Sequence, residues 1–160
     1  MNDETPRAKA LRLWEEAQRV HMRGELGEAI RLYRESLRVE ETAEARTFLG
    51  WALGGQGDVD AAIAECKVAI QLDPDFGNPY NDIGAYLIEK GELEAAIPWL
   101  ERAKAAKRYA PKHFPYLNLG RIYMKTGKVS RAIAEFEAAL KIHPGDPLAK
   151  QSLEKLRTFN

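Results

Sequence analysis

"GRIYMKTGKVSRAIAEFEAALKIHP" (residues 120–144) places small and aromatic residues at set intervals within a stretch of helical character. Gly120 is followed seven residues later by Gly127, and Ala132 and Phe136 come next. Apolar residues recur at three- and four-residue spacing on both sides of Gly127, as they do on one face of a helix. The stretch therefore predicts two amphipathic helices joined by a tight turn at Gly127.

The same arrangement recurs through most of the chain. Copies of the first glycine stand 34 and 36 residues apart, at Gly50, Gly84 and Gly120. A fainter copy upstream has Ala17 in place of this glycine. The second glycine of the four copies is Gly24, Gly57, Gly91 and Gly127. Self-similarity at this period indicates stacked helix pairs that bury their apolar faces against their neighbours.

Local signals agree with helix pairs. The second glycine of each unit falls where the first helix should end, a position that favours a left-handed residue without a Cβ atom. Helix starts are expected at Thr5-Pro6, Asn78-Pro79 and Asp146-Pro147, because each joins a capping residue to a proline at the first helical position.

The unit resembles the tetratricopeptide repeat family, whose pattern is an aromatic, Leu-Gly, an aromatic, Gly, Ala, an aromatic, Ala and Pro. The last unit matches throughout, with Tyr116, Leu119, Gly120, Tyr123, Gly127, Ala132, Phe136, Ala139 and Pro144. The resemblance implies an all-α fold, an α-solenoid of about four helix-turn-helix repeats plus a C-terminal capping helix. The expected divisions are an extension (1–9), the array (10–146, with approximate units 10–42, 43–76, 77–112 and 113–146) and the capping helix (147–160) with Leu148, Leu153, Leu156 and Phe159 on one side.

Several positions depart from the family pattern. Arg46 and Cys66 stand where aromatic residues are usual, and Cys66 is expected to be an inert core thiol. Arg108 stands where proline is usual, so the second helix of the third unit is expected to run on to Ala110-Pro111. Pro98 lies inside that helix, where proline removes a hydrogen bond and favours a kink.

Composition narrows the classes of function. Lys plus Arg and Asp plus Glu each number 24, and the pI is about 6.9, so no global charge favours nucleic acid or an anionic membrane. A single cysteine forms no internal disulfide and fits a reducing compartment. The polar start of the chain lacks the apolar run of a signal peptide, and no later stretch is long enough to span a membrane. We expect a cytoplasmic protein.

No catalytic, cofactor or metal motif is present in the sequence. The stretch Gly50–Gly57 has the glycine spacing of a phosphate-binding loop but lacks its Lys and Ser/Thr. His21, His113 and His143 are each isolated in the sequence. We therefore expect a protein that is not an enzyme and that needs no cofactor and no metal.

The resemblance implies a concave groove lined by the first helix of each repeat. Groove residues lie six and three positions before the first glycine and one, four and five after it. Gly54 and Gly55 are expected to leave bare backbone beside Trp51, and substituting Gly54 by alanine is expected to be mild. The residues expected to contact a bound peptide are Trp14, Gln18, Trp51, Asn78, Asn81, Ile88, Phe114, Leu117, Arg121 and Met124. Packing of Trp14 and Trp51 on neighbouring helices is the alternative.

Family members that clamp an acidic C-terminal tail use Lys, Arg and Asn at set positions of the groove. The matching positions here hold no cationic clamp in either register, and Asp82 would repel a carboxylate. A basic run (Lys104, Lys107, Arg108, Lys112 and His113) is the other candidate surface, for an acidic partner.

Three functions remain. The first is a non-catalytic interaction module or adaptor that binds an apolar or amphipathic peptide segment in the groove. The alternatives are a self-assembling structural scaffold, which makes the chain a homo-oligomer, or a helper subunit of a larger complex. The capping helix favours the first, because a covered end limits open-ended stacking.

Overall fold

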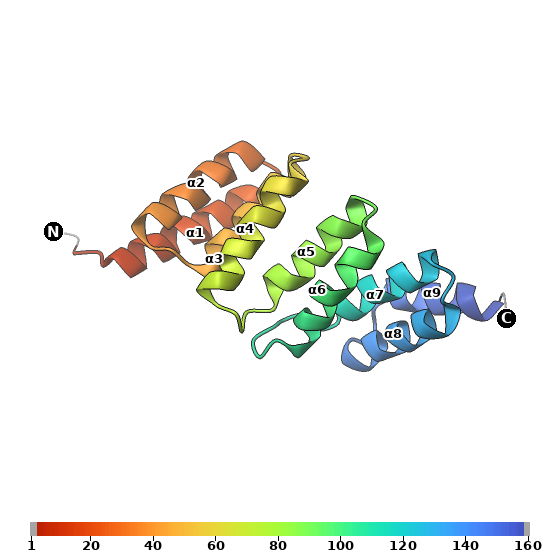
Figure 1. Cartoon of the computed structure of the whole chain (residues 1–160). Helices are drawn as coiled ribbons and strands as arrows, with labels where there is room; N and C mark the ends of the chain where they lie inside the picture. The colour runs from red at the N-terminus through yellow and green to blue at the C-terminus, as the bar shows by residue number, and fades with distance from the viewer. Residues whose placement is uncertain (1–2, 159–160) are drawn as a thin grey trace.

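The computed structural model describes residues 3–158, which form nine helices in an elongated array with the two termini at opposite ends (Figure 1). The helices are α1 (Pro6–Met22), α2 (Leu26–Val39), α3 (Ala43–Gly55), α4 (Val59–Leu72), α5 (Asn78–Glu89), α6 (Leu93–Ala105), α7 (Phe114–Lys125), α8 (Val129–Ile142) and α9 (Pro147–Thr158). Within these residues there is no strand, and one isolated bridge joins Phe76 to Arg108. The all-α prediction is confirmed.

The helices are arranged as four pairs and a cap. Each odd-numbered helix from α1 to α7 packs against the even-numbered helix that follows it, and α9 packs on α8. The odd-numbered helices also contact one another in succession, α1 with α3, α3 with α5 and α5 with α7. Because this layer is the more closely packed, the array curls toward it. The concave face is therefore the face of α1, α3, α5 and α7.

Two of the three expected helix starts are confirmed. The Thr5 hydroxyl accepts a hydrogen bond from the Ala8 amide at 3.1 Å, and the Asp146 carboxylate accepts one from the Ala149 amide at 2.9 Å. The expectation for Asn78 is wrong, because Asn78 is the first residue of α5 and Gly77 takes the cap position without a side-chain bond.

The turn glycines adopt the expected left-handed conformation. Their φ angles are +81° at Gly24, +91° at Gly57, +81° at Gly91 and +73° at Gly127. Apart from the glycine and its two chain neighbours, no atom lies within 4 Å of the place where a Cβ atom at any of the four would be built. Conformation, rather than space, therefore selects glycine at these turns.

Gly91→Ala tests this selection. The variant is expected to lose about 1 kcal/mol of unfolding free energy in urea, because an L-residue is strained at positive φ. Gly27→Ala is the matched control. Gly27 also has nothing near its missing Cβ but lies in the first turn of α2, so alanine there is expected to be neutral or stabilising by up to about 1 kcal/mol. Equal effects of the two changes would contradict this account.

The first glycine of a unit is selected by close packing instead. A Cβ atom at Gly120 would lie 2.6 Å from the ring of Phe136, which is fully buried between α7 and α8. Cys66 takes the place of that aromatic in the second unit. It is fully buried, so its expected place in the core is confirmed, and burial raises the pKa of its thiol, which disfavours the reactive thiolate.

The third unit differs from the expectation. Its second helix, α6, contains Pro98 and ends at Ala105 instead of running on to residues 110–111. The chain then pairs with the preceding linker: the Gly77 amide donates to the Arg108 carbonyl and the Arg108 amide to the Asp75 carbonyl, both at 2.9 Å. Tyr109 packs directly on Gly77. These bonds anchor, at Arg108, the loop formed by residues 106–113, which we call the α6–α7 loop.

The cap covers the last pair through Ala149, Leu153 and Leu156, which are buried. Leu148 was expected on the same side but is 40% exposed, and Phe159 lies outside the described residues. Among residues 3–158, no helix is both long and apolar enough to cross a membrane.

Candidate functional site

The N-terminal half of the concave face carries a row of aromatic rings. Trp14 of α1 meets Phe48 of α3 edge-on at 5.6 Å between ring centres, and Phe48 meets Trp51 in the same way at 5.9 Å. His21 supports Trp51 from α1, with its ring centre 4.5 Å away. Trp14 is half-buried in this row, whereas Trp51 is 48% exposed. The tryptophans therefore divide between the two expectations, since Trp14 packs on its neighbour and Trp51 faces solvent.

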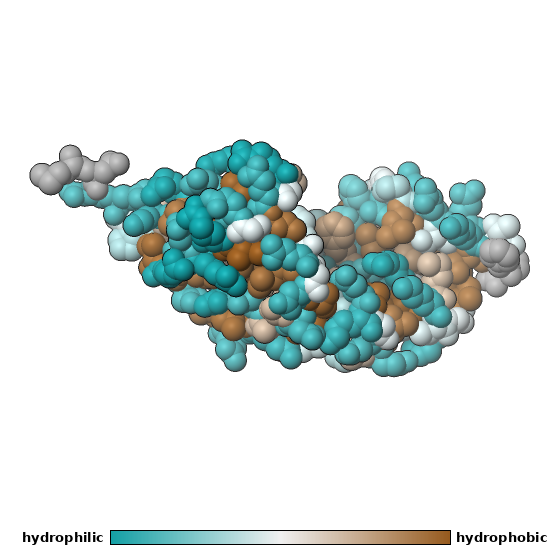
Figure 2. Space-filling view, turned by 90° about the horizontal axis from the view of Figure 1, so that it is seen from above, coloured by the Kyte–Doolittle hydropathy of each residue, from teal (hydrophilic) through white to brown (hydrophobic). Residues whose placement is uncertain are grey.

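Trp51 forms one wall of a pocket between α3, α5 and α7. The pocket has a volume of about 280 Å³. Phe114, at the start of α7, is 42% exposed and stacks on His113 at 4.6 Å between ring centres. The pocket is lined by Thr47, Phe48, Trp51, Asn78, Asn81, Asp82, Tyr109, Pro111 and Phe114. Figure 2 shows one face of the molecule, on which hydrophobic residues reach the surface in patches between hydrophilic ones.

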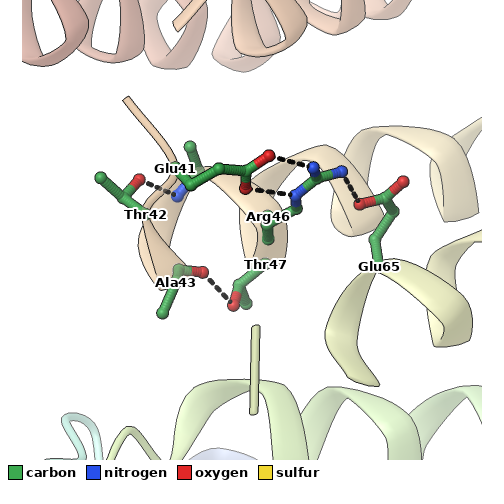
Figure 3. Close-up of polar contacts among 7 residues, drawn as sticks. Glu41, Thr42, Ala43, Arg46, Thr47 and Glu65 are labelled. Carbon is green, nitrogen blue, oxygen red and sulfur yellow. Dashed lines mark hydrogen bonds and ion pairs between the residues drawn. The ribbon is translucent and has the colours of Figure 1, made fainter. Parts of the chain in front are cut away.

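The pocket wall on α3 is fixed by bonds within α3 and across to α4 (Figure 3). The Thr47 hydroxyl donates to the Ala43 carbonyl at 2.8 Å, so this donor is already satisfied within the helix. Arg46, one residue before it, points the other way and bridges Glu41 and Glu65, the latter at 2.8 Å. The ion pairs at Arg46 join α3 to α4 where the family pattern has an aromatic residue.

A chain of polar side chains leaves the pocket toward the C-terminal half of the groove. The Asn118 amide donates to the Asn81 side-chain oxygen at 3.0 Å, and Arg121 donates to the Asn118 side-chain oxygen at 3.1 Å. Asn81 and Asn118 are buried. Their amides are therefore oriented before any ligand arrives, and Arg121 is held along α7.

Asp82 is the one acidic group that lines this pocket. Burial raises the pKa of its carboxyl group to about 7, although the neighbouring Asn81 amide favours the charged form. No Lys, Arg or His of residues 3–158 forms an ion pair with it, whereas the nearby Arg108 is paired with Glu44 and Asp73. The pocket thus combines exposed aromatic faces with an uncompensated carboxyl group.

The structure brings four of the expected groove residues together at this pocket: Trp51, Asn78, Asn81 and Phe114. Arg121 and the half-buried Met124 continue along α7, while Trp14 and Gln18 lie on α1 away from the pocket. Ile88 and Leu117 are corrections, because they are only 5% and 4% exposed and belong to the core between the helices. A partner cannot reach these two side chains.

The expectation of bare backbone beside Trp51 holds only in part. Gly55 is exposed, although a Cβ atom there would lie 3.0 Å from Leu26, whereas Gly54 is partly covered by the Tyr86 ring, 3.0 Å from its missing Cβ. Neither glycine lines the pocket, whose other walls come from α5, α7 and the α6–α7 loop.

Five further lining residues were outside the ten predicted contacts: Thr47, Phe48, Asp82, Tyr109 and Pro111. Thr47 lies three positions before the repeat glycine, at a groove position of the register. Phe48 and Asp82 lie two positions before the repeat glycine, where the family also places ligand-binding side chains, so the register alone could have found them. Tyr109 and Pro111 could not be found in this way, because they belong to the loop that replaced the end of the expected helix.

The basic run does not form one free surface. Lys104 pairs with Glu135 at 2.9 Å, Arg108 pairs with two carboxylates, and His113 is buried. Only Lys107 and Lys112 of this run are left without an ion pair among residues 3–158. The run is therefore largely neutralised within the fold.

The structure places two of the isolated histidines beside an aspartate. His113, His143 and Asp146 bring possible metal-ligand atoms within 4.8 Å of one another, at the ends of three different helices. Sequence spacing gave no sign of this group. Asp146 already caps α9, and His113 stacks between Phe114 and His143. Burial and the neighbouring His143 lower the pKa of His113, against the opposite pull of Asp146.

Comparison with protein families agrees with the helix pairs and their glycines. Models described as tetratricopeptide repeat match residues 22–75 and 113–146, together more than half of the chain. The chain is a tetratricopeptide repeat protein. No curated protein matches it.

Solved structures share the fold of this tetratricopeptide repeat protein. PilF of Pseudomonas aeruginosa is 20% identical with a TM-score of 0.88, and the match covers 94% of this chain and 68% of PilF. MamA of Desulfovibrio magneticus RS-1 is 27% identical with a TM-score of 0.75, over 94% and 85% of the two chains. YrrB, described as having an unusual peptide-binding site, is 18% identical with a TM-score of 0.72, over 91% and 74%. The likeness to PilF and YrrB shows the fold alone.

Proposed function

We propose that this protein is a non-catalytic interaction module whose concave pocket binds a short amphipathic segment of a partner protein. The observation that carries the proposal is that two large aromatic residues from different helices, Trp51 of α3 and Phe114 of α7, line one pocket and stay exposed. Aromatic anchors around a small pocket are typical of the residues that dominate binding energy. YrrB supports the proposal as a protein of the same fold with a peptide-binding site.

The pocket also offers directional contacts. Asn78 presents a half-buried amide beside the aromatic walls, while Asn81 is buried at the pocket and held in place by Asn118. An amide such as that of Asn78 fits the backbone of an extended peptide, which exposes both donors and acceptors. Apolar side chains of the segment would then pack on the rings, and its backbone would bond to Asn78.

Peptide selection on the purified full chain tests the proposal. Short peptides displayed on phage would be selected, synthesised with a fluorophore and titrated by anisotropy. Trp51→Ala is expected to weaken the selected peptides by about 2–4 kcal/mol, as loss of a central aromatic anchor does. Leu72→Ala is the matched control, because Leu72 is similarly exposed (45%) but lies at the end of α4, outside the pocket. Peptides that bind both variants equally would contradict the proposal.

Sedimentation over a concentration series separates the proposal from self-assembly. An interaction module is expected to remain monomeric when no partner is present. A reversible dimer or higher oligomer that Trp51→Ala disrupts would instead assign the groove to a second copy of this chain.

A further inference from the structure

The pocket is lined by one acidic residue, Asp82, that has no ion-pair partner among residues 3–158 and that an apolar ligand would leave unpaired. Asp82 lies among aromatic rings and asparagines, half-buried, with no cationic partner among residues 3–158. A buried carboxylate is costly unless it is paired. An unpaired acidic group that lines a pocket therefore points to a ligand that completes the pair.

The protein's own cations do not provide the missing partner. Arg108 does not line the pocket; it is paired with Glu44 and Asp73 and lies over the ring of Phe76, with its guanidinium 4.4 Å from the ring centre. Arg121 is engaged with Asn118. The negative charge that Asp82 brings to the pocket is therefore available to a bound molecule.

We propose, on the basis of the proposed function, that the pocket accepts a lysine or arginine side chain of the bound segment, which pairs with the Asp82 carboxylate. The walls suit such a side chain for two reasons. Ring faces such as those of Trp51 and Phe114 attract cations, and the apolar stem of lysine or arginine packs on rings while its charged end remains polar. We therefore expect the bound segment to carry one lysine or arginine with apolar residues on either side of it.

The choice of a cation also follows from what the pocket excludes. An acidic side chain or a C-terminal carboxylate would meet Asp82 as a like charge. A purely apolar side chain would bury Asp82 further and leave it unpaired. A cationic side chain instead forms an ion pair with Asp82, which offsets the cost of burying the carboxylate.

The experiment uses the phage-selected peptides and three forms of the full chain: the wild type, Asp82→Asn and Glu94→Gln. Selected peptides are expected to share a lysine or arginine flanked by apolar residues. Asp82→Asn is expected to weaken such a peptide at least about tenfold, because the ligand cation is left without its partner. Glu94→Gln is the matched control, since it removes a negative charge at an exposed position of α6, a helix outside the concave face. It is expected to change affinity less than about twofold.

A change on the peptide side completes the comparison. Replacing the peptide's lysine by norleucine keeps most of the stem and removes the ammonium group. This peptide is expected to lose affinity for the wild type but to bind Asp82→Asn about as well as the lysine peptide does. Equal losses of affinity on both proteins would show that the lysine does not act through Asp82 and would overturn the inference.

The dependence of affinity on pH supplies a second readout. The carboxyl group must be ionised to bind a cation, so wild-type affinity is expected to rise from about pH 6.5 to pH 8.5, while Asp82→Asn stays flat. The groups that act on Asp82 or face it are Cys66 of α4, Tyr86 of α5 and Tyr109 of the α6–α7 loop, whose pKa values burial raises. His21 packs on Trp51 and His113 stacks on Phe114, and burial lowers the pKa of both histidines, which disfavours their charged forms over this range.

The outcomes separate the two proposals. Peptides that depend on Trp51 but carry no cation, or that bind Asp82→Asn unchanged, would overturn the cation inference and leave the peptide-binding function standing. Peptides indifferent to both Trp51→Ala and Asp82→Asn would overturn both. Self-association that Asp82→Asn abolishes would assign the cation to a second copy of this chain and overturn its assignment to a partner protein.

Discussion

Replacing Gly120 by leucine is expected to lower the free energy of unfolding by about 3 kcal/mol, the upper range for overpacking a core. The added side chain would begin 2.6 Å from the Phe136 ring, and Phe136 is fully buried and has no free space to enter. The pair α7 and α8 would have to separate. Urea denaturation followed by circular dichroism measures the loss.

Gly54→Ala is the comparison for Gly120→Leu. From the sequence this change was expected to be mild, but the new Cβ would lie 3.0 Å from the Tyr86 ring, which is itself buried. A shift of a few tenths of an ångström can relieve that contact, so we expect a loss of about 1 kcal/mol or less. Equal shifts in the melting temperature of the two variants would contradict the repeat register.

Replacing Asp82 by asparagine is expected to stabilise the protein at about pH 8 by roughly 2–4 kcal/mol. Burial raises the pKa of Asp82 from 3.8 to about 7 in the folded state. At alkaline pH the folded state must therefore hold an unpaired, partly desolvated charge, which the unfolded state leaves in water. Asparagine removes that charge and keeps nearly the same shape.

The sign of this effect depends on pH. Between the unfolded pKa of 3.8 and the folded pKa of about 7, the folded state binds more protons than the unfolded state. The contribution of Asp82 to stability is therefore greatest at low pH and is lost as pH rises through 7. The lowered pKa values of His21 and His113 act in the opposite direction.

Urea titrations of the wild type and Asp82→Asn at matched pH values isolate the aspartate, because the histidine contributions cancel in the difference. The difference in unfolding free energy between the two proteins is expected to narrow from about pH 8 to about pH 5. A difference that stays constant, or that widens on acidification, would contradict the raised pKa of Asp82. A variant that is more stable yet binds a cationic peptide less well would mark Asp82 as a residue kept for binding.

The sequence predicted those parts of the fold that depend on contacts within one repeat. The left-handed turns at Gly57 and Gly91 follow from the conformation of a single residue. The close approach at Gly120 follows from a pair of residues at fixed spacing. Because these local requirements recur in successive repeats, they could be recognised from the sequence.

Features that depend on contacts between repeats could not be predicted in this way. The α6–α7 loop departs from the pattern because Arg108 bonds to a linker more than 30 residues earlier in the chain. In the site, the register found Trp51, Asn81 and Phe114, but it could not show that Ile88 is buried. The curvature that closes neighbouring helices over a groove position is set by the packing of the whole array.

The α6–α7 loop has a consequence for the entropy of binding. Loops that line a binding pocket are often mobile, and a ligand must then supply the free energy to order them. Here Tyr109 and Pro111 line the pocket from a segment already held by two backbone hydrogen bonds to the preceding linker and by packing on Gly77. A bound segment would meet this wall in its final position. Little of its binding free energy would be spent on ordering the protein, so even a short segment could bind with useful affinity.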